Sequence, residues 1–396
     1  MEKNWRTKFN QSWKEENYQA MYHKIKVDFN HDLPFRMSET PGFFDQEMID
    51  LMLDAANDIG AQVASKQILE FSESVFDICP YKVPGEESVS SFFQADFGIT
   101  INAKGEIIPQ LIEVQGFPSL YFYQSYLAHL YKDAYSLDQN LSIYLNHMEE
   151  VRYFAHLKEI ILNGEAPENV VMLEIEPEKQ NTYIDFLCTS KALGIKILCI
   201  SKVIKEGKKL YYKSENGDLI AIKRIYNRII FDELVQKELD LHFNLTDDVE
   251  VTWAGHPNWF FKLSKFILPR LSGPYVPQSY FLHEAPLHAI ALSDYVLKPL
   301  FSFAGSGVIL DVNEEILSKI PDPQNYILQK KVSYAPVIET PDGPSKCEVR
   351  IMYLWLPGAD KPTVVSNLLR MSKGEMIGVK YNKNKTWVGG SVGFSV

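Results

Sequence analysis

Hydrophobic and polar positions along the 396-residue chain predict an alternation of helices and strands. Residues 1–85 are mainly polar and aromatic, and over 44–52 the apolar side chains recur at the spacing that predicts the start of a helix. Residues 92–101 and 107–114 are apolar runs of strand length around a Lys-Gly turn, so we expect a hairpin. A helix is expected to follow at about 121–135.

The middle of the chain alternates between strand and helix patterns. Residues 169–173 form a short apolar run, 180–193 have helical spacing ending at Gly194, and 195–200 form a second apolar run. This βαβ order predicts a small Rossmann-like lobe with a parallel sheet at about 165–250. The lobe lacks a GxGxxG motif, so the sequence does not indicate a dinucleotide site there.

The final third of the chain contains the remaining strand patterns, which lie at 295–300, 308–310, 326–332, 349–355 and 363–369. No repeat or low-complexity tract interrupts the sequence. We therefore expect an α/β (α+β) protein with three lobes: 1–150, which holds the N-terminal helices and the hairpin; 151–250, the Rossmann-like lobe; and 251–396, the last group of strands.

Composition narrows the classes of function. Hydrophobic residues make up 46% and charged residues 23%, which is ordinary for a globular protein. A net charge of -11 argues against nucleic-acid and anionic-membrane partners, because the field would repel both. The first residues carry no signal-type apolar core, no stretch approaches a membrane span, and the four widely spaced cysteines form no CxxC pair. We therefore expect a cytoplasmic protein with neither of those partners.

A lysine followed by a loop of small residues is the first candidate for chemistry. Lys298 lies in the predicted strand at 295–300, and Gly305, Ser306 and Gly307 follow it. Backbone N–H groups of such a loop can surround phosphate oxygens, while the ammonium group supplies a positive charge for the same anion. The alternative interpretation is a surface lysine before an ordinary Gly-Ser turn.

Two carboxylates and an amide on the predicted hairpin form a candidate cation site. Glu113 and Gln115 point to the same face of one strand, because side chains alternate along it. Asp96 on the partner strand can join them, which would surround a hard cation such as Mg²⁺ with oxygen ligands. A solvated strand face with incidental acids is the alternative. The apolar neighbours of Glu113 favour burial, which is costly for an uncompensated carboxylate.

Other polar side chains lie near the ends of predicted strands. Arg350 and Arg370 suit a bidentate grip on phosphate or carboxylate, although surface ion pairs are the commoner use of arginine. The segment 222–228 adds positive charge that would otherwise form a solvated basic face. Gln329 and Lys330 end an apolar strand, as residues around an adenine often do. The chain has no GxSxG-type signature of a hydrolase triad.

Taken in order, these motifs resemble the circularly permuted ATP-grasp proteins, a group that includes the synthetase domain of glutathionylspermidine synthases. The resemblance covers roughly residue 92 to the C-terminus and uses the segments 94–97, 111–115, 225–228, 263–271, 295–307, 326–329, 349–351 and 368–370. In unpermuted ATP-grasp enzymes the acidic Glu-x-Asn strand follows the lysine strand. Its early position here indicates the permutation, and the middle lobe then resembles the Rossmann-like lobe that precedes the ATP-grasp core.

The resemblance implies ATP and Mg²⁺ as cofactors. Lys265 and Lys298 would hold ATP phosphates, Gly305–Gly307 would close over them, and Gln329 with the neighbouring Lys330 backbone would face adenine. The family reaction forms an acyl phosphate from a carboxylate, and an amine then displaces phosphate. Positioning and charge neutralisation carry such a reaction without a nucleophilic side chain.

The same likeness assigns the remaining site residues. Asp96 and Glu113 would bind Mg²⁺, and Gln115 stands in the place of the family's asparagine. Arg350 and Arg370 match its two arginine strands. Gln94 stands where glutathionylspermidine synthases have an arginine that stabilises the tetrahedral intermediate.

Three functions remain open at the level of sequence. The first is an ATP-dependent ligase that joins a small-molecule or peptide carboxylate to an amine. The second is a non-catalytic nucleotide-binding module, which the changes at Gln94 and Gln115 favour. The third is a phosphotransferase, whose product would be a stable phosphorylated molecule instead of an amide.

Overall fold

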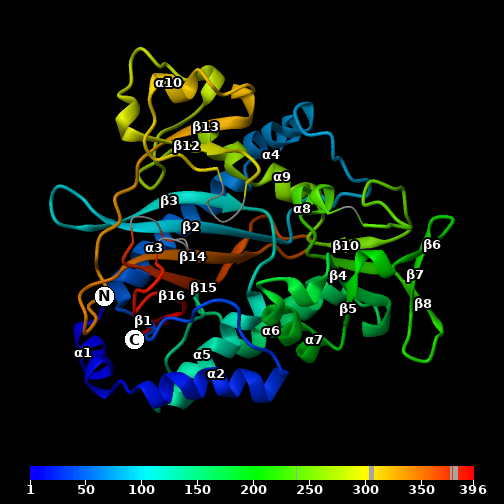
Figure 1. Ribbon diagram of the computed structural model, residues 1–396, viewed down its shortest axis with the longest axis horizontal. Helices are drawn as coiled ribbons and strands as arrows, with labels where there is room; N and C mark the ends of the chain where they lie inside the picture. The colour runs from blue at the N-terminus through cyan, green and yellow to red at the C-terminus, as the bar shows by residue number, and fades with distance from the viewer. Residues whose placement is uncertain (238, 303–306, 375–376, 378–381) are drawn as a thin grey trace.

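The computed structural model describes residues 1–396 except 238, 303–306, 375–376 and 378–381 (Figure 1). A five-stranded antiparallel sheet occupies the middle of the molecule, with strand order β16 (Gly389–Ser391), β15 (Thr363–Ser372), β14 (Lys346–Leu354), β2 (Phe92–Ile101) and β3 (Ile107–Gln115). The predicted hairpin is therefore confirmed as β2 and β3. We call this the central sheet.

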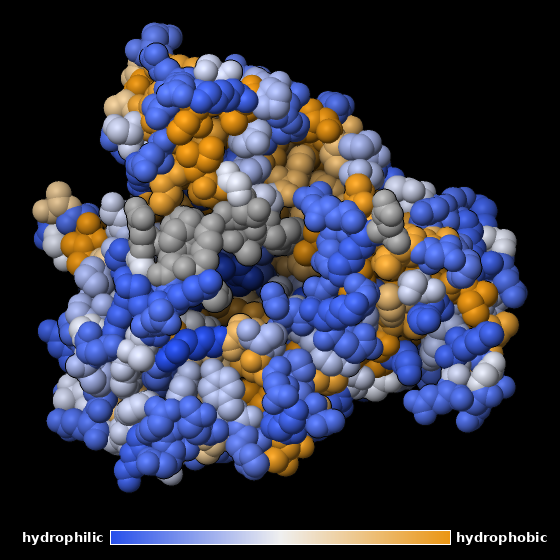
Figure 2. Space-filling view, in the orientation of Figure 1, coloured by the Kyte–Doolittle hydropathy of each residue, from blue (hydrophilic) through white to orange (hydrophobic). Residues whose placement is uncertain are grey.

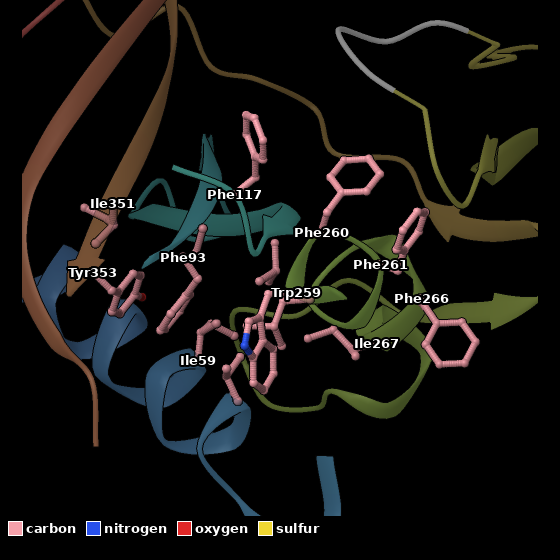
Figure 3. Packing of buried hydrophobic residues seen from close by; sticks show 14 of the residues in the cluster. Ile59, Phe93, Phe117, Trp259, Phe260, Phe261, Phe266, Ile267, Ile351 and Tyr353 are labelled. Atoms are coloured by element: carbon pink, nitrogen blue, oxygen red, sulfur yellow. The ribbon is translucent and has the colours of Figure 1, made fainter. Parts of the chain in front are cut away.

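Helices cover both faces of the central sheet, and side chains of β14 alternate between them. Ile351 and Tyr353 pack into the cluster on the side of α3 (Gln46–Val63), where the Tyr353 hydroxyl donates a 2.8 Å hydrogen bond to the carbonyl of Ala56 (Figure 3). Met352 and Leu354 belong to the other cluster, together with side chains of α2 (Glu15–Phe29) and α5 (Tyr121–Tyr135). A strand buried on two faces is apolar at most of its positions, which explains the long apolar runs in the sequence.

The predicted βαβ unit is present as a four-stranded parallel sheet, at the right in Figure 1. Its order is β10 (Thr252–Ala254), β9 (Arg224–Asn227), β4 (Val170–Glu174) and β5 (Lys196–Cys199). Between β4 and β5 lies α7 (Tyr183–Leu193), which ends at Gly194 in the left-handed conformation with φ 73°. The strand β10 lies just beyond residue 250, where we expected this lobe to end. An antiparallel meander of β6 (Ile204–Glu206), β7 (Lys209–Lys213) and β8 (Leu219–Ile222) extends from it.

A three-stranded antiparallel sheet forms the lobe at the top of Figure 1 and is called here the β12 sheet. Its order is β11 (Ser279–Phe281), β13 (Tyr326–Lys330) and β12 (Tyr295–Pro299). The prediction of a strand at 308–310 is wrong, because within this segment only Ile309 forms a β-bridge, and its partner is Leu297. The chain turns away there into α10 (Glu314–Leu317), whose first turn is capped by the Asn313 side chain.

Two segments near the ends of the chain lie side by side. The strand β1 (Gly42–Phe44) pairs in parallel with β17 (Gly393–Ser395). The remaining α-helices are α1 (Lys3–Ser12), α4 (Lys66–Glu73), α6 (Glu150–Leu162), α8 (Phe231–Gln236) and α9 (Asn258–Lys262). Short 3₁₀ helices complete the fold: η1 (Ser74–Asp77), η2 (Pro167–Asn169), η3 (Pro177–Lys179), η4 (Ile200–Lys202), η5 (Lys265–Arg270), η6 (Leu282–Glu284), η7 (Leu292–Asp294) and η8 (Pro323–Asn325). In the described part of the chain, no helix is long and apolar enough to cross a membrane.

Candidate functional site

A row of charged residues crosses the central sheet from strand to strand. Glu113 of β3 lies opposite Asp96 of β2, and Asp96 lies opposite Arg350 of β14. One step along the same strands, Glu348 of β14 lies opposite Arg370 of β15. The pairing register therefore brings together residues that are up to 274 positions apart in the sequence.

Asp96 lies at the centre of this row and accepts hydrogen bonds from both arginines. Arg350 donates from Nε to Oδ1 at 2.6 Å and from Nη2 to Oδ2 at 2.7 Å, and Arg370 Nη2 also contacts Oδ2. Burial opposes the charge on Asp96, but the two guanidinium groups outweigh it and hold the pKa of Asp96 below its usual value. Glu348 contacts the same Arg370 at 2.5 Å, while its burial raises its pKa.

A β-bulge in β3 shapes the contact between the two sheets. Asp96 pairs with Glu113 but the next residue of β2 pairs with Leu111, so Ile112 has no partner across the ladder. Lys298 of β12 donates a 3.1 Å hydrogen bond to the carbonyl of Ile112 and a 2.5 Å bond to Oε1 of Gln329. Gln329 of β13 in turn donates to the carbonyl of Leu111 at 3.2 Å. Both hydrogen-bond partners of Lys298 are neutral, and its burial lowers its pKa to about 8.

Lys265 approaches the same place from η5. Its ammonium group donates to the carbonyl of Ser302 at 2.7 Å and lies 3.7 Å from Oε2 of Glu113. The other oxygen of Glu113 accepts a hydrogen bond from the side-chain amide of Gln115. The segment 263–271, which the resemblance matches to a helix of the family, contains the 3₁₀ helix η5, and Pro269 inside it disfavours an α-helix because proline lacks the N–H of an α-helical bond.

A cavity of about 580 Å³ opens beside the charged row. Glu113, Gln115, Arg350 and Arg370 line one part of it. Figure 2 shows the hollow in this face, below the lobe of the β12 sheet and with strongly hydrophilic side chains in it. Sequence reasoning missed the wall formed by the two ends of the chain, which contribute Phe35, Arg36, Gly389 and Gly390.

Arg228 and Glu174 line another part of the cavity, where strands of the parallel lobe end. Arg228 is 2% exposed, and its guanidinium lies 5.0 Å from each of the Phe117 and Phe186 ring centres. Its Nε and Nη1 atoms have no hydrogen-bond partner, and Asp185 is 3.9 Å away. Burial raises the pKa of Glu174 to about 8. Their position at the ends of predicted parallel strands could have identified Arg228 and Glu174 as site residues, because α/β proteins commonly bind ligands there.

The structure groups most of the predicted site residues. The predicted site residues that lie around the meeting of the two sheets are Asp96, Glu113, Gln115, Lys265, Lys298, Gln329, Arg350 and Arg370. Lys330 is exposed at the end of β13, and Gly307 is exposed with φ 71°. Gly305 and Ser306 lie outside the described residues. Gln94 is fully buried and donates to the carbonyl of Ser119 at 2.7 Å, and it is not among the cavity's lining residues.

The oxygen-bearing side chains at this site suit a Mg²⁺ ion that is bound together with a nucleotide better than a metal ion that is held by protein side chains alone. Among the described residues, no group of three or more histidine, cysteine, aspartate or glutamate side chains could hold a metal ion. Mg²⁺ commonly takes one or two carboxylates and completes its shell with water and phosphate oxygens. Glu113 and Gln115 carry side-chain oxygen atoms and line the cavity, whereas arginine occupies both oxygens of Asp96.

Comparison with known proteins shows that the mixed α/β fold of the chain is similar to that of an ATP-grasp protein. The similar structure is the apo form of a glutathione synthetase-like effector from Globodera pallida, with a TM-score of 0.57, 13% sequence identity and 98% of each chain covered. No protein-family model matches the chain. No curated protein matches it either. At this identity the likeness establishes the fold alone.

Proposed function

We propose that the chain is an ATP-dependent carboxylate–amine ligase with a circularly permuted ATP-grasp fold. One observation carries the proposal: Lys298 is a buried lysine with neutral hydrogen-bond partners, beside Glu113 at the meeting of two sheets. A buried ammonium group is stabilised when an anion supplies the missing charge. The likeness of the fold to a glutathione synthetase-like protein supports the same function.

The proposed nucleotide site lies between the β12 sheet and the bulge of β3. Lys298 and Lys265 hold the phosphates, and Gln329 with the backbone at Lys330 faces the adenine. Of the glycine loop that the sequence suggests for the phosphates, the structure describes Gly307, which follows β12 in the chain. Glu113 and Gln115, with Asp96 behind them, support a Mg²⁺ ion. ATP supplies the phosphoryl group that activates the carboxylate.

Arg350 and Arg370 face the reacting carboxylate in this proposal. A carboxylate oxygen attacks the γ-phosphorus and ADP leaves, so an acyl phosphate forms. The amine nitrogen then attacks the acyl carbon, the carbon–oxygen bond to phosphate breaks, and the amine loses a proton. The two guanidinium groups offset the charge on the transferring phosphoryl and acyl oxygens.

The proposed substrate is a small molecule or peptide, and the size of the cavity supports it. Its volume of about 580 Å³ suits a ligand of metabolite size. Arg228 offers unpartnered donors for an anionic group, and Glu174 with a pKa of about 8 is largely neutral at pH 7. This balance favours a negatively charged carboxylate substrate over a polycation.

ADP release in mixtures of carboxylates and amines tests the proposal. Amide formation that depends on both components supports the ligase, and a stable phosphorylated product supports the phosphotransferase. A non-catalytic nucleotide-binding module is the second candidate, and the buried Gln94 favours it because its amide donates to Ser119 and the residue does not line the cavity. Tight binding of Mg²⁺-ATP without turnover in any mixture would exclude the ligase in favour of that module.

A further inference from the structure

Tyr334 lies on the segment that leads from β13 of the β12 sheet to β14 of the central sheet. Its hydroxyl group donates a 2.5 Å hydrogen bond to Oε2 of Glu348. The other carboxylate oxygen of Glu348 lies 2.5 Å from Nη2 of Arg370. Tyr334 therefore reaches the cavity-lining arginine through a single intervening carboxylate.

Gly98 of β2 makes room for this tyrosine. It lies opposite Glu348 in the ladder, and a Cβ atom at Gly98 would lie 2.9 Å from Cε1 of Tyr334 and 3.0 Å from Cγ1 of Val332. The aromatic ring therefore lies directly against the backbone of β2. The next residue, Ala335, fixes the segment by donating its N–H to the carbonyl of Ile99 at 2.8 Å.

The guanidinium group of Arg370 is anchored through one nitrogen atom, and a second nitrogen atom has no hydrogen-bond partner. Its contacts with Asp96 and Glu348 both involve Nη2. Its Nε atom is buried without a hydrogen-bond partner, and the residue lines the cavity. A guanidinium anchored through one nitrogen keeps its remaining N–H donors for an anion, provided that the anchor fixes its orientation.

We propose that Tyr334 is a positioning residue for this arginine. Its hydroxyl group fixes the Glu348 carboxylate, and Glu348 then holds Arg370 in the orientation that a phosphate or carboxylate in the cavity requires. The identity of that anion rests on the proposed function, whereas the hold of Tyr334 on Arg370 does not. Because Tyr334 follows β13, the placement of the β12 sheet is coupled to the orientation of Arg370.

Chemical modification of the ligand-free protein tests the positioning directly. Tyr334→Phe keeps the ring and removes the hydroxyl, and phenylglyoxal modification of individual arginines is followed by mass spectrometry. Loss of one hydrogen bond is expected to speed modification of Arg370 by about three- to tenfold. Arg350, which Asp96 holds by two bonds of its own, should keep its rate.

The matched control is Tyr295→Phe, which removes a 2.9 Å hydroxyl bond to Gln278 in the same β12 sheet and should leave Arg370 unchanged. Gly98→Ala, which crowds the Tyr334 ring, should reproduce the effect of Tyr334→Phe. An unchanged Arg370 rate in Tyr334→Phe overturns the proposal. Equal acceleration of Arg350 and Arg370 overturns it as well, since that result reports general loosening.

Calorimetry then separates this proposal from the proposed function. With Mg²⁺-ADP present, Tyr334→Phe is expected to weaken binding of inorganic phosphate by about fivefold and to leave ADP affinity unchanged. If the wild-type protein binds neither ADP nor phosphate, the proposed function fails. The modification rates still decide the role of Tyr334 in that case.

Discussion

The ammonium group of Lys298 lies 3.1 Å from the backbone carbonyl of Ile112, the residue that the bulge in β3 leaves without a partner in β2. Together with the hydrogen bond from Gln329 to the carbonyl of Leu111, this contact joins the β12 sheet to the central sheet. A regular ladder would direct that carbonyl into a strand pair, so the bulge frees it to receive the lysine. The nucleotide site that we propose lies around this contact.

Lys298→Ala is expected to abolish measurable ATP binding. The substitution removes the buried ammonium group that we place against the phosphates, and alanine cannot replace its charge. Isothermal titration of Mg²⁺-ATP into both proteins measures the loss. Lys319→Ala is the control, because Lys319 is an exposed lysine paired with Glu315 on α10. Wild-type affinity in Lys298→Ala would remove Lys298 from the site.

The affinity for ATP is expected to fall as the pH rises from 7 to 9. Burial lowers the pKa of Lys298 to about 8, so the free protein loses this charge above that pH. The charged form binds phosphate, and the affinity should therefore drop by up to about tenfold per pH unit above pH 8. A flat profile over this range would show that Lys298 stays charged or does not contact the nucleotide.

Glu113→Gln is expected to weaken the dependence of ATP binding on Mg²⁺. The substitution keeps the size of the side chain but removes the negative charge that a hard cation requires. Since the loss of an outer-shell partner alone can weaken metal binding about tenfold, we expect at least that change here. Glu106→Gln in the β2–β3 turn is the control. Identical Mg²⁺ titrations for Glu113→Gln and the wild type would exclude Glu113 as a ligand.

Asp96→Asn is expected to destabilise the fold by about 3 kcal/mol at pH 7, because it leaves the buried Arg350 and the partly buried Arg370 without their shared counter-charge. The folded pKa of Asp96 is lowered, so its contribution is present above the unfolded value of about 3.9 and is lost as the pH falls through the folded pKa. Urea unfolding at several pH values measures this. Asp218→Asn, in an exposed turn, should unfold like the wild type.

Glu174→Gln is expected to stabilise the protein at high pH and to change little near pH 4.5. The pKa of Glu174 rises from 4.5 to about 8 on folding, so between these values the folded state binds a proton that the unfolded state lacks. Stability therefore declines as the pH rises through this window, by roughly 1.4 kcal/mol per pH unit from this residue alone. Glutamine stays neutral and removes that decline.

Thermal unfolding between pH 5 and pH 9 measures the difference between Glu174→Gln and the wild type. The exposed Glu178 provides the matched control, since Glu178→Gln should follow the wild-type pH profile. Parallel profiles for Glu174→Gln and the wild type would show that Glu174 is ionised in the folded protein at neutral pH.

Local sequence patterns predicted the elements well where one segment decides its own structure. The hairpin, the helix at 121–135 and the βαβ unit were confirmed, because each depends on periodicity, a turn or a helix-ending glycine. The strand at 308–310 failed because a three-residue apolar run carries no information about the chain direction after it. Beyond Asn313 the capping side chain starts a helix instead.

The candidate site was only partly predictable, because its geometry depends on pairing between distant strands. Asp96 was expected to bind a metal, and its role as a ligand stays a prediction. No local pattern indicated that Arg350, 254 residues away, would occupy both of its oxygens. The Tyr334–Glu348 bond was equally hidden, since it requires the connection after β13 to cross β2 at Gly98.

The parallel pairing of β1 with β17 has a consequence for the order of folding. Part of the cavity wall joins residues near both ends of the chain, and Trp387 donates its N–H to Glu39 across 348 positions. Such contacts close very long loops of the chain, and we expect them to form late because the chain entropy must be lost first. During synthesis the helices and the parallel lobe can form early, while the cavity is complete only after the last strands have left the ribosome.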